Sequence, residues 1–311
     1  MVGNEHNLSS LYLVVASIYI FRAWFSLPSQ MLGSNGSPVN AAYGFTKFLT
    51  ELLERSKPSH IVIAFDESLT HSFRNEIYPP YKMNRELPPQ ELKQQFSLCR
   101  RIAESAGIQC VAHDRYEADD LIGTLANAAK HRDQRVVIVS ADKDLAQLIG
   151  NDDQFWDFAA NKLLSSELVQ EKFGVTSQQM TDYLGLCGDA VDNIPGVPGV
   201  GPKTAVALLQ SFADMETLYA DLAKVATLDI RGAKKLPEKL ALYKEQAYLS
   251  KTLATIALDA PIDCSLEFTQ RNPVDVHALQ LITEELGRRG AGLFERMIQN
   301  TAAPMQTTAC N

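Results

Sequence analysis

Cysteine is scarce in this sequence, and its five cysteines are scattered along the chain. Their number is odd and none forms a Cys-x-x-Cys pair, so neither a disulfide framework nor a zinc site is indicated. This usage fits a reducing compartment, and we expect a cytoplasmic protein.

Long apolar runs are also missing. The apolar stretch at residues 11–21 is too short to span a membrane. It does not match a signal peptide either, because residues 1–10 carry Glu5 and no Lys or Arg. We therefore expect a buried strand here and no membrane partner.

An excess of positive charge is absent too. The chain has 29 Lys and Arg against 37 Asp and Glu, a formal net charge of −8. A negative balance by itself disfavours a nucleic-acid partner. Carboxylates that bind metal ions would inflate the negative count, however, and the bound cations would offset it. The net charge therefore decides little.

Apolar patterning predicts an α/β fold with a mainly parallel central sheet flanked by helices. Three segments have the pattern of buried strands, at residues 11–16, 60–65 and 135–140. Segments with helical periodicity separate them, at residues 39–55, 89–106 and 118–129. From about residue 165 the pattern changes to short helices, at residues 177–186, 203–212 and 236–255.

The chain has four expected parts. Its 311 residues, 46% of them hydrophobic, suffice for one large domain or two closely associated ones. The parts are a disordered N-terminus at residues 1–10, an α/β core at 11–164, a helical region at 165–300 and a flexible tail at 301–311. The tail is expected to fray because it is small and polar without periodicity.

Acidic residues follow the predicted strands or open a predicted helix. They are Asp66, Glu117, Asp119, Asp120, Asp142 and Asp144. In an open α/β sheet, ligands bind beyond the carboxyl ends of the strands, so we expect these side chains to converge on one edge.

Such crowding of like charges would be costly unless cations neutralised it. Carboxylates without His or Cys suit Mg²⁺ or Mn²⁺. Two such ions about 3.5–4 Å apart would activate a water and stabilise the leaving oxygen of a phosphodiester. The alternative for Asp119 and Asp142 is the capping of a helix or turn.

Asp189 and Asp192 precede a segment rich in Gly and Pro. Their spacing places both carboxylates on one face of a helical turn, where they can share a cation. The glycines of residues 194–204 let backbone N–H groups approach a phosphate before a helix begins. The residues expected to bind a phosphate backbone here are Gly196, Gly199, Gly201, Lys203 and Thr204. The alternatives are a solvated helix face and an ordinary turn.

Basic and aromatic residues share the segment from Arg74 to Arg101. Six basic residues stand against three acidic ones, and Phe73, Tyr78 and Tyr81 are interleaved. Basic and aromatic side chains together suit a single strand of nucleic acid, through phosphate pairing and base stacking. The alternative is a solvated helix face with core aromatics.

These motifs, in this order, resemble those of the 5′-nuclease superfamily. That superfamily includes the 5′→3′ exonuclease domain of bacterial DNA polymerase I, its stand-alone relatives, phage 5′-exonucleases and flap endonucleases. The match runs from about residue 12 to residue 255. It is carried by residues 65–66, 73–74, 78–85, 117–120, 142–144 and 188–196.

The resemblance implies a PIN/resolvase-like sheet and a helix-three-turn-helix at about residues 189–212, which grips duplex DNA and can hold K⁺. It also implies a helical arch at about residues 74–100, where Arg74 and Tyr81 contact the strand and Lys82 and Arg85 lie near the scissile phosphate. The metal ligands it implies are Asp66, Glu117, Asp119 and Asp142 for one ion and Asp120, Asp144, Asp189 and Asp192 for a second.

Residue 15 departs from the family pattern. The family opens with a strand that ends in Asp, followed by a small residue and Ser. Here Val15 precedes Ala16 and Ser17, so one expected ligand is missing.

The expected function is Mg²⁺-dependent cleavage, by a monomer, of DNA at 5′ ends and flaps, with RNA primers as a further substrate, in replication or repair. It would act in trans, because no polymerase domain follows. The alternatives are a structure-specific DNA-binding protein of the same fold, whose catalysis Val15 impairs, and an unrelated metal-dependent phosphatase.

Overall fold

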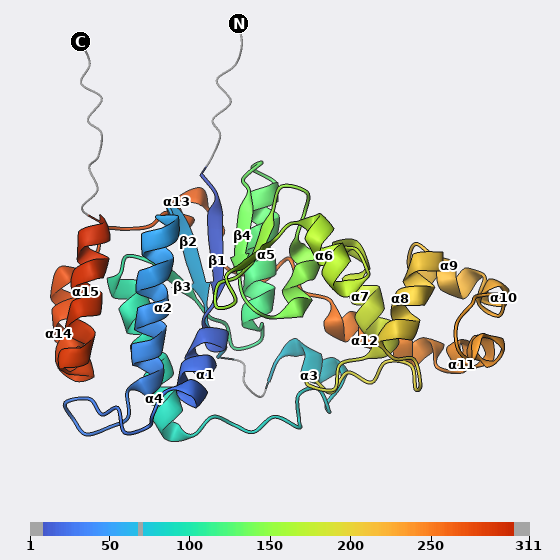
Figure 1. The fold of residues 1–311 in the computed structure, drawn as a ribbon, viewed down its shortest axis with the longest axis horizontal. Helices are drawn as coiled ribbons and strands as arrows, with labels where there is room; N and C mark the ends of the chain where they lie inside the picture. The colour runs from blue at the N-terminus through green and yellow to red at the C-terminus, as the bar shows by residue number, and fades with distance from the viewer. Residues whose placement is uncertain (1–8, 68–70, 302–311) are drawn as a thin grey trace, which may run out of the picture.

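The computed structural model describes residues 9–67 and 71–301, and a six-stranded sheet forms its centre (Figure 1). The strands are β1 (Leu11–Val15), β2 (His60–Ala64), β3 (Gln109–Val111), β4 (Val136–Val139), β5 (Gln154–Asp157) and β6 (Lys162–Leu164). Their order is β3-β2-β1-β4-β5-β6, and all neighbours pair in parallel except β5 and β6. The predicted mainly parallel sheet is confirmed, with three short strands that the pattern did not reveal.

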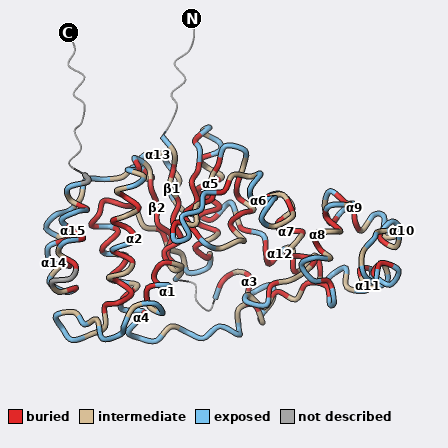
Figure 2. Tube along the Cα trace, viewed as in Figure 1, coloured by how far each residue is buried: buried red, intermediate tan, exposed pale blue. Residues whose placement is uncertain are grey.

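The two faces of β1 contact different helices. Leu13 and Val15 pack in one apolar cluster with α5 (Ala118–Lys130), whereas Val14 packs in another with α2 (Asn40–Ser56). Successive side chains of a strand point to opposite faces, so an uninterrupted apolar strand fits a sheet covered on both sides. Buried residues accordingly lie on the strands and on the helices of both sides, and they continue into the helices that follow the sheet (Figure 2).

Helices from both ends of the chain cover the α2 side. They are α1 (Ala16–Ser26), α4 (Gln90–Ser105), α14 (Val276–Leu286) and α15 (Arg288–Thr301). The last two pack on α4 and α2 (Figure 1). The sequence pattern places α14 and α15 with the helical region at residues 165–300, because an amphipathic pattern does not tell which layer a helix joins.

Short helices after the sheet form an arm on the other side of the molecule (Figure 1). They are α6 (Ser166–Phe173), α7 (Met180–Cys187), α8 (Pro202–Ser211), α9 (Met215–Ala220), α10 (Leu222–Val225), α11 (Leu236–Leu242) and α12 (Lys244–Ala254), with 3-10 turns η2 (Ser177–Gln179) and η3 (Ala233–Lys235). The short helix α13 (Leu266–Thr269) returns to β2. Within the described ranges, no helix combines the length and apolarity needed to cross a bilayer.

The single helix predicted at residues 236–255 is two helices in the structure. The helix is interrupted at Tyr243, between α11 and α12. Buried positions keep helical spacing across the break, from Leu240 to Ala247. Periodicity alone therefore could not reveal it.

The expected helical arch at residues 74–100 is interrupted by a loop. Only α3 (Phe73–Ile77) and the first part of α4 are helical, and residues 78–89 between them form turns and loop. Two Pro-Pro pairs at residues 79–80 and 88–89 explain this, because proline lacks the N–H donor and disfavours helix in the residue before it. We call residues 78–89 the basic loop, since it carries Lys82 and Arg85.

Candidate active site

A cavity of about 230 Å³ lies beyond the carboxyl ends of β1 and β2. Its lining includes Asp66, which follows β2, Glu117 and Asp119 at the start of α5, and Asp142, which precedes the 3-10 helix η1 (Lys143–Leu148). The predicted convergence of these four carboxylates on one edge of the sheet is confirmed. Their assignment as metal ligands stays a prediction.

Burial and crowding shift the pKa values of two of these groups. Burial, with the nearby charges of Asp142 and Asp66, raises the pKa of Asp119 well above its usual range. Burial also raises the pKa of Asp142, although a hydrogen bond from the Asp144 N–H opposes the shift. Such anions are stable only with a cation close by, and carboxylate oxygens are the ligands that hard divalent cations prefer.

Cations of the basic loop reach the same carboxylates. Lys82 Nζ donates to Glu117 Oε1 at 2.8 Å and lies 3.6 Å from Asp192 Oδ2, and Arg85 pairs with Asp192. Burial lowers the pKa of the Lys82 ammonium, but the two carboxylates outweigh this effect and hold the pKa well above its usual range. Both basic side chains also line the cavity.

Two further predicted ligands, Asp144 and Asp189, contact Lys143. Burial, helped by the charge of Asp142, raises the pKa of Asp144 to about 7. Within the described structure, Asp144 Oδ1 is buried without a hydrogen-bond partner. Burial raises the pKa of Asp189, but its ion pair with Lys143 outweighs this effect and holds the pKa below its usual range. This oxygen of Asp144 could therefore coordinate a cation.

The acidic groups do not close into a metal site by themselves. In residues 9–67 and 71–301, no three or more His, Cys, Asp or Glu side chains have the arrangement of a metal site. Val15, 3% exposed and paired with Ala64 of β2, supplies no oxygen. Lys82 and Lys143 form ion pairs with Glu117 and Asp189. Carboxylate oxygens are suitable ligands for a divalent cation, and a bound cation would replace the lysines in these pairs.

Asp120 already has partners for both of its carboxylate oxygens. It is fully buried, and it accepts from the two terminal nitrogens of Arg74 at 2.8 and 2.7 Å and from the Ala257 N–H at 2.8 Å. A buried charge requires such partners. The assignment of Asp120 as a metal ligand stays a prediction, and a metal ion there would have to replace Arg74.

Arg74 and Tyr81 are each 3% exposed, so little of either side chain is accessible, and their contacts with DNA stay predictions. The Tyr81 hydroxyl donates to Glu117 Oε2 at 3.0 Å. These two side chains support the acidic groups from behind.

The Gly-rich hairpin joins α7 to α8. Gly196 has a φ of 59°, its N–H donates to Ser250 Oγ at 2.9 Å, and a Cβ there would collide with the backbone of Gly188. Close backbone packing thus accounts for a glycine at residue 196, and its contact with DNA stays a prediction. Gly199, Gly201 and Lys203 are exposed and Thr204 is partly exposed, as a phosphate-binding surface requires.

Lys239 of α11 is a neighbour of the hairpin that sequence reasoning missed. Its Nζ lies 2.7 Å from where a Cβ on Gly199 would stand, so a second cation accompanies Lys203. The basic run at residues 231–239 was the available signal, but nothing in the sequence places it beside the hairpin.

Two family models match the chain in succession. One describes the 5′–3′ exonuclease N-terminal resolvase-like domain and matches residues 10–174. The other describes the 5′–3′ exonuclease C-terminal SAM fold and matches residues 175–277. Fold and site thus define a class, a resolvase-like α/β domain with an acidic cavity joined to a SAM-fold helical domain.

Individual proteins are similar to this chain in sequence or in fold. DNA polymerase I of Bacillus caldotenax is 39% identical over 298 residues, 94% of this chain and 32% of that protein. The 5′–3′ exonuclease of Buchnera aphidicola subsp. Schizaphis graminum is 37% identical over 258 residues, 83% of this chain and 89% of the relative. A bacteriophage T5 flap endonuclease solved with DNA and metal ions shares the fold, with a TM-score of 0.63 and 18% identity over 93% of this chain and 99% of that one.

The chain belongs to the 5′–3′ exonuclease family. It spans about a third of the length of the DNA polymerase I relatives.

Proposed function

We propose that this chain is a metal-dependent 5′→3′ exonuclease and 5′-flap endonuclease that hydrolyses phosphodiesters in DNA. The observation that carries the proposal is that four carboxylates line the same cavity as the cations of the basic loop. The carboxylates belong to Asp66, Glu117, Asp119 and Asp142. Membership in the 5′–3′ exonuclease family supports it, as do the DNA and metal ions bound to the T5 enzyme of the same fold.

The four carboxylates would hold the metal, with Asp144, Asp189 and Asp192 serving a second position. Bound Mg²⁺ or Mn²⁺ would lower the pKa of a water molecule and stabilise the leaving oxygen of the phosphodiester. As the scissile phosphate arrives, Lys82 and Arg85 exchange their carboxylate partners for phosphate oxygens and steady the developing negative charge.

The hairpin would hold the duplex part of the substrate. Gly199 and Gly201 let the backbone approach a phosphate, Lys203 adds charge, and Thr204 lies in the first turn of α8. Backbone carbonyls of this hairpin would hold a K⁺ ion. We further propose that the substrates are 5′ ends and flaps, including RNA–DNA junctions, and that a monomer in the cytoplasm cuts them during replication or repair.

Cleavage of a 5′-labelled flap duplex tests the proposal. We expect products in Mg²⁺ and in Mn²⁺ and none in EDTA, with Asp119→Asn losing cleavage while it keeps duplex affinity in Ca²⁺. A small phosphate monoester should not be hydrolysed.

Val15→Asp, assayed beside the parent chain, separates the alternatives. Cutting by the parent establishes that the remaining carboxylates suffice. Binding without cutting, with cutting restored by Val15→Asp, would identify a DNA-binding protein with disabled catalysis. Absence of both binding and cutting in both folded proteins would overturn the proposal.

A further inference from the structure

Hydrogen bonds fasten the basic loop to the turn that leads into the hairpin. The Lys82 N–H donates to the Asp192 carbonyl at 3.0 Å, and Asn193 Nδ2 donates to the Pro80 carbonyl at 2.6 Å. Asn84 Nδ2 donates to the Ala190 carbonyl at 2.9 Å. We call this set, between residues 80–84 and 190–193, the loop–turn contact. It joins segments more than a hundred residues apart in the chain.

Backbone conformation makes this contact specific. Lys82 and Asn193 both adopt the left-handed region, with φ of 55° and 56°. Side chains other than glycine are uncommon there, although asparagine is enriched. Each of the two residues makes a hydrogen bond to the other segment, Lys82 through its N–H and Asn193 through its side-chain amide. The conformation of Lys82 also directs its ammonium toward Glu117.

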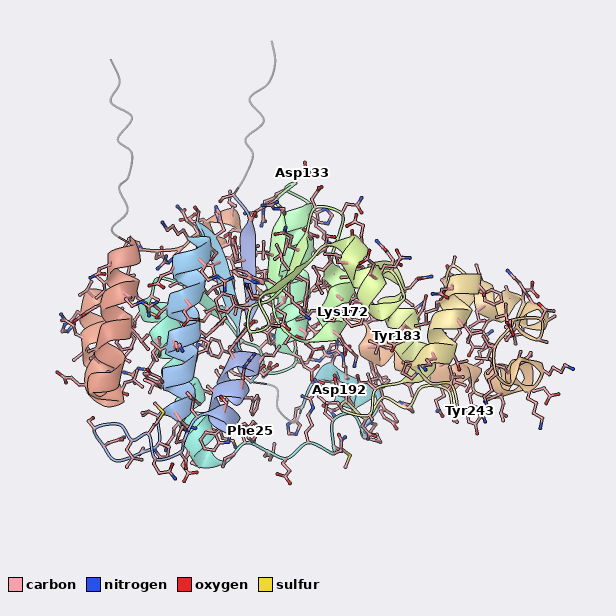
Figure 3. The ribbon with its side chains drawn as sticks, in the orientation of Figure 1. Phe25, Asp133, Lys172, Tyr183, Asp192 and Tyr243 are labelled. Atoms are coloured by element: carbon pink, nitrogen blue, oxygen red, sulfur yellow. The ribbon has the colours of Figure 1, made fainter. Side chains whose placement is uncertain are left out.

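An apolar cluster underlies the contact. Tyr81 of the basic loop and Ile194 of the turn are buried together with Leu184 of α7 and Leu253 of α12. The turn continues directly into the hairpin, and Asp189 and Ile194 exchange two backbone hydrogen bonds at 2.8 and 2.9 Å. Asp192, labelled in Figure 3, pairs with Lys82 and Arg85 of the basic loop, so the turn lies against that loop. Hydrogen bonds and apolar packing therefore connect the hairpin to the basic loop.

We propose that Asn193, assisted by Asn84, is a positioning residue that couples duplex binding at the hairpin to the placement of Lys82 and Arg85 at the cavity. Its amide holds the Pro80 carbonyl, two residues before Lys82. A shift of the turn when the hairpin engages duplex DNA is passed to the basic loop through this bond. The inference rests on the proposed function.

Two substitutions of Asn193 isolate the amide. Asn193→Gly permits the left-handed backbone and removes the donor, whereas Asn193→Asp keeps the size and replaces the donor by an acceptor. The matched control is Asn161→Gly, another left-handed asparagine, with φ of 52°, in the turn between β5 and β6. Asn84→Ala probes the exposed end of the contact.

Flap cleavage supplies the first readout. Both Asn193 variants should lower kcat by about tenfold or more, while KM and duplex affinity in Ca²⁺ stay within about twofold, because the cations are misplaced but the hairpin is intact. Asn161→Gly should match the parent. A change in KM with unchanged kcat would overturn the proposal.

Limited digestion with trypsin supplies a readout that needs no metal and no activity. Cleavage after Lys82 and Arg85 should be about two- to tenfold faster in Asn193→Gly, because one hydrogen bond no longer restrains the loop. Adding a blunt duplex should slow this cleavage in the parent and not in the variant.

Equal duplex protection in the parent and the variant would contradict the coupling. If the parent itself proves unable to cut DNA, the proposed function fails, and the digestion still decides whether hairpin and loop are coupled. A reduced kcat in Asn84→Ala, smaller than that of Asn193→Gly, would agree with its assisting role.

Discussion

At the scale of single residues, the cavity depends on which side chains oppose its carboxylates. Val15 ends β1 with an apolar side chain, and Lys82 and Lys143 take acidic partners that a metal ion would otherwise use. Asp120, by contrast, is satisfied by Arg74 and by backbone. Neighbouring acidic residues in the chain thus have different duties, set by what each one contacts.

Val15→Asp should exchange stability for metal dependence. A new buried charge beside the other carboxylates should lower the free energy of unfolding in EDTA by roughly 1–3 kcal/mol. Saturating Mg²⁺ should raise the Tm of this variant more than that of the parent, because the ion binds the folded state. Thermal unfolding with and without Mg²⁺ measures both effects. Val15→Asn is the uncharged control, and equal Mg²⁺ shifts for the parent and Val15→Asp would contradict the expectation.

Asp144 should make stability depend on pH in the absence of metal. Its folded-state pKa of about 7 exceeds that of an ordinary aspartate, about 3.9, so the folded protein keeps a proton that the unfolded chain has lost. This stabilising contribution is full below about pH 4 and disappears as the pH rises to about 7, at no more than about 1.4 kcal/mol per pH unit.

Urea denaturation in EDTA across this range tests the expectation. Asp144→Asn should reduce the fall in stability with rising pH, whereas Asp229→Asn, at an exposed position, is the control. An identical pH slope in Asp144→Asn and the parent would show that the buried carboxyl group does not titrate in this way.

At the scale of elements, the hairpin and α11 present charge together. Lys203 stands at the start of α8, and Lys239 reaches over Gly199 from a helix that follows some forty residues later. A duplex that contacts the hairpin therefore meets cations from two helices.

Each of these lysines should contribute to the salt dependence of duplex binding. Lys203→Ala and Lys239→Ala should each lower the slope of log affinity against log salt concentration by about 0.9, one phosphate contact apiece. Titrations in Ca²⁺ at several KCl concentrations measure it. Lys57→Ala, after α2 and before β2, is the control, and an unchanged slope in Lys239→Ala would remove this residue from the interface.

At the scale of the whole molecule, the chain closes its own core. Helices α14 and α15 return from the arm to α4 and α2, where Leu279, Ile282 and Leu286 join the apolar cluster on that face of the sheet. This final segment lies beyond the family-model matches, which end at residue 277. We therefore expect it to contribute to stability more than to DNA binding.

A matched pair on α14 tests this. Leu279 is 0% exposed and Leu281 is 50% exposed. Leu279→Ala should lower the free energy of unfolding by about 2–5 kcal/mol, because it leaves a cavity in the core. Leu281→Ala should change it by less than about 0.5 kcal/mol. Chemical denaturation measures both, and duplex affinity should be unchanged in each; a weakened affinity in Leu279→Ala would place α14 in the interface.

The sequence by itself determined the class of fold, the edge of the sheet where the acidic residues meet, and the hairpin. These are local matters: strands and helices have different apolar periods, parallel strands end at a common edge, and glycine marks backbone that must turn or approach closely. Asp66, Glu117, Asp119 and Asp142 could be found in this way because each directly follows a strand or opens a helix.

Only the tertiary structure decided which charged groups pair with each other and which remain accessible to a ligand. The sequence suggested Arg74 as a DNA contact and Asp120 as a metal ligand, but the two form a buried pair. Lys239 lies over the hairpin, which no sequence pattern indicates. Asn193 lies in the matched motif at residues 188–196, but the motif does not reveal that its amide donates to the Pro80 carbonyl. Burial and pairing arise from contacts between segments far apart in the chain, and neither periodicity nor motif spacing carries that information.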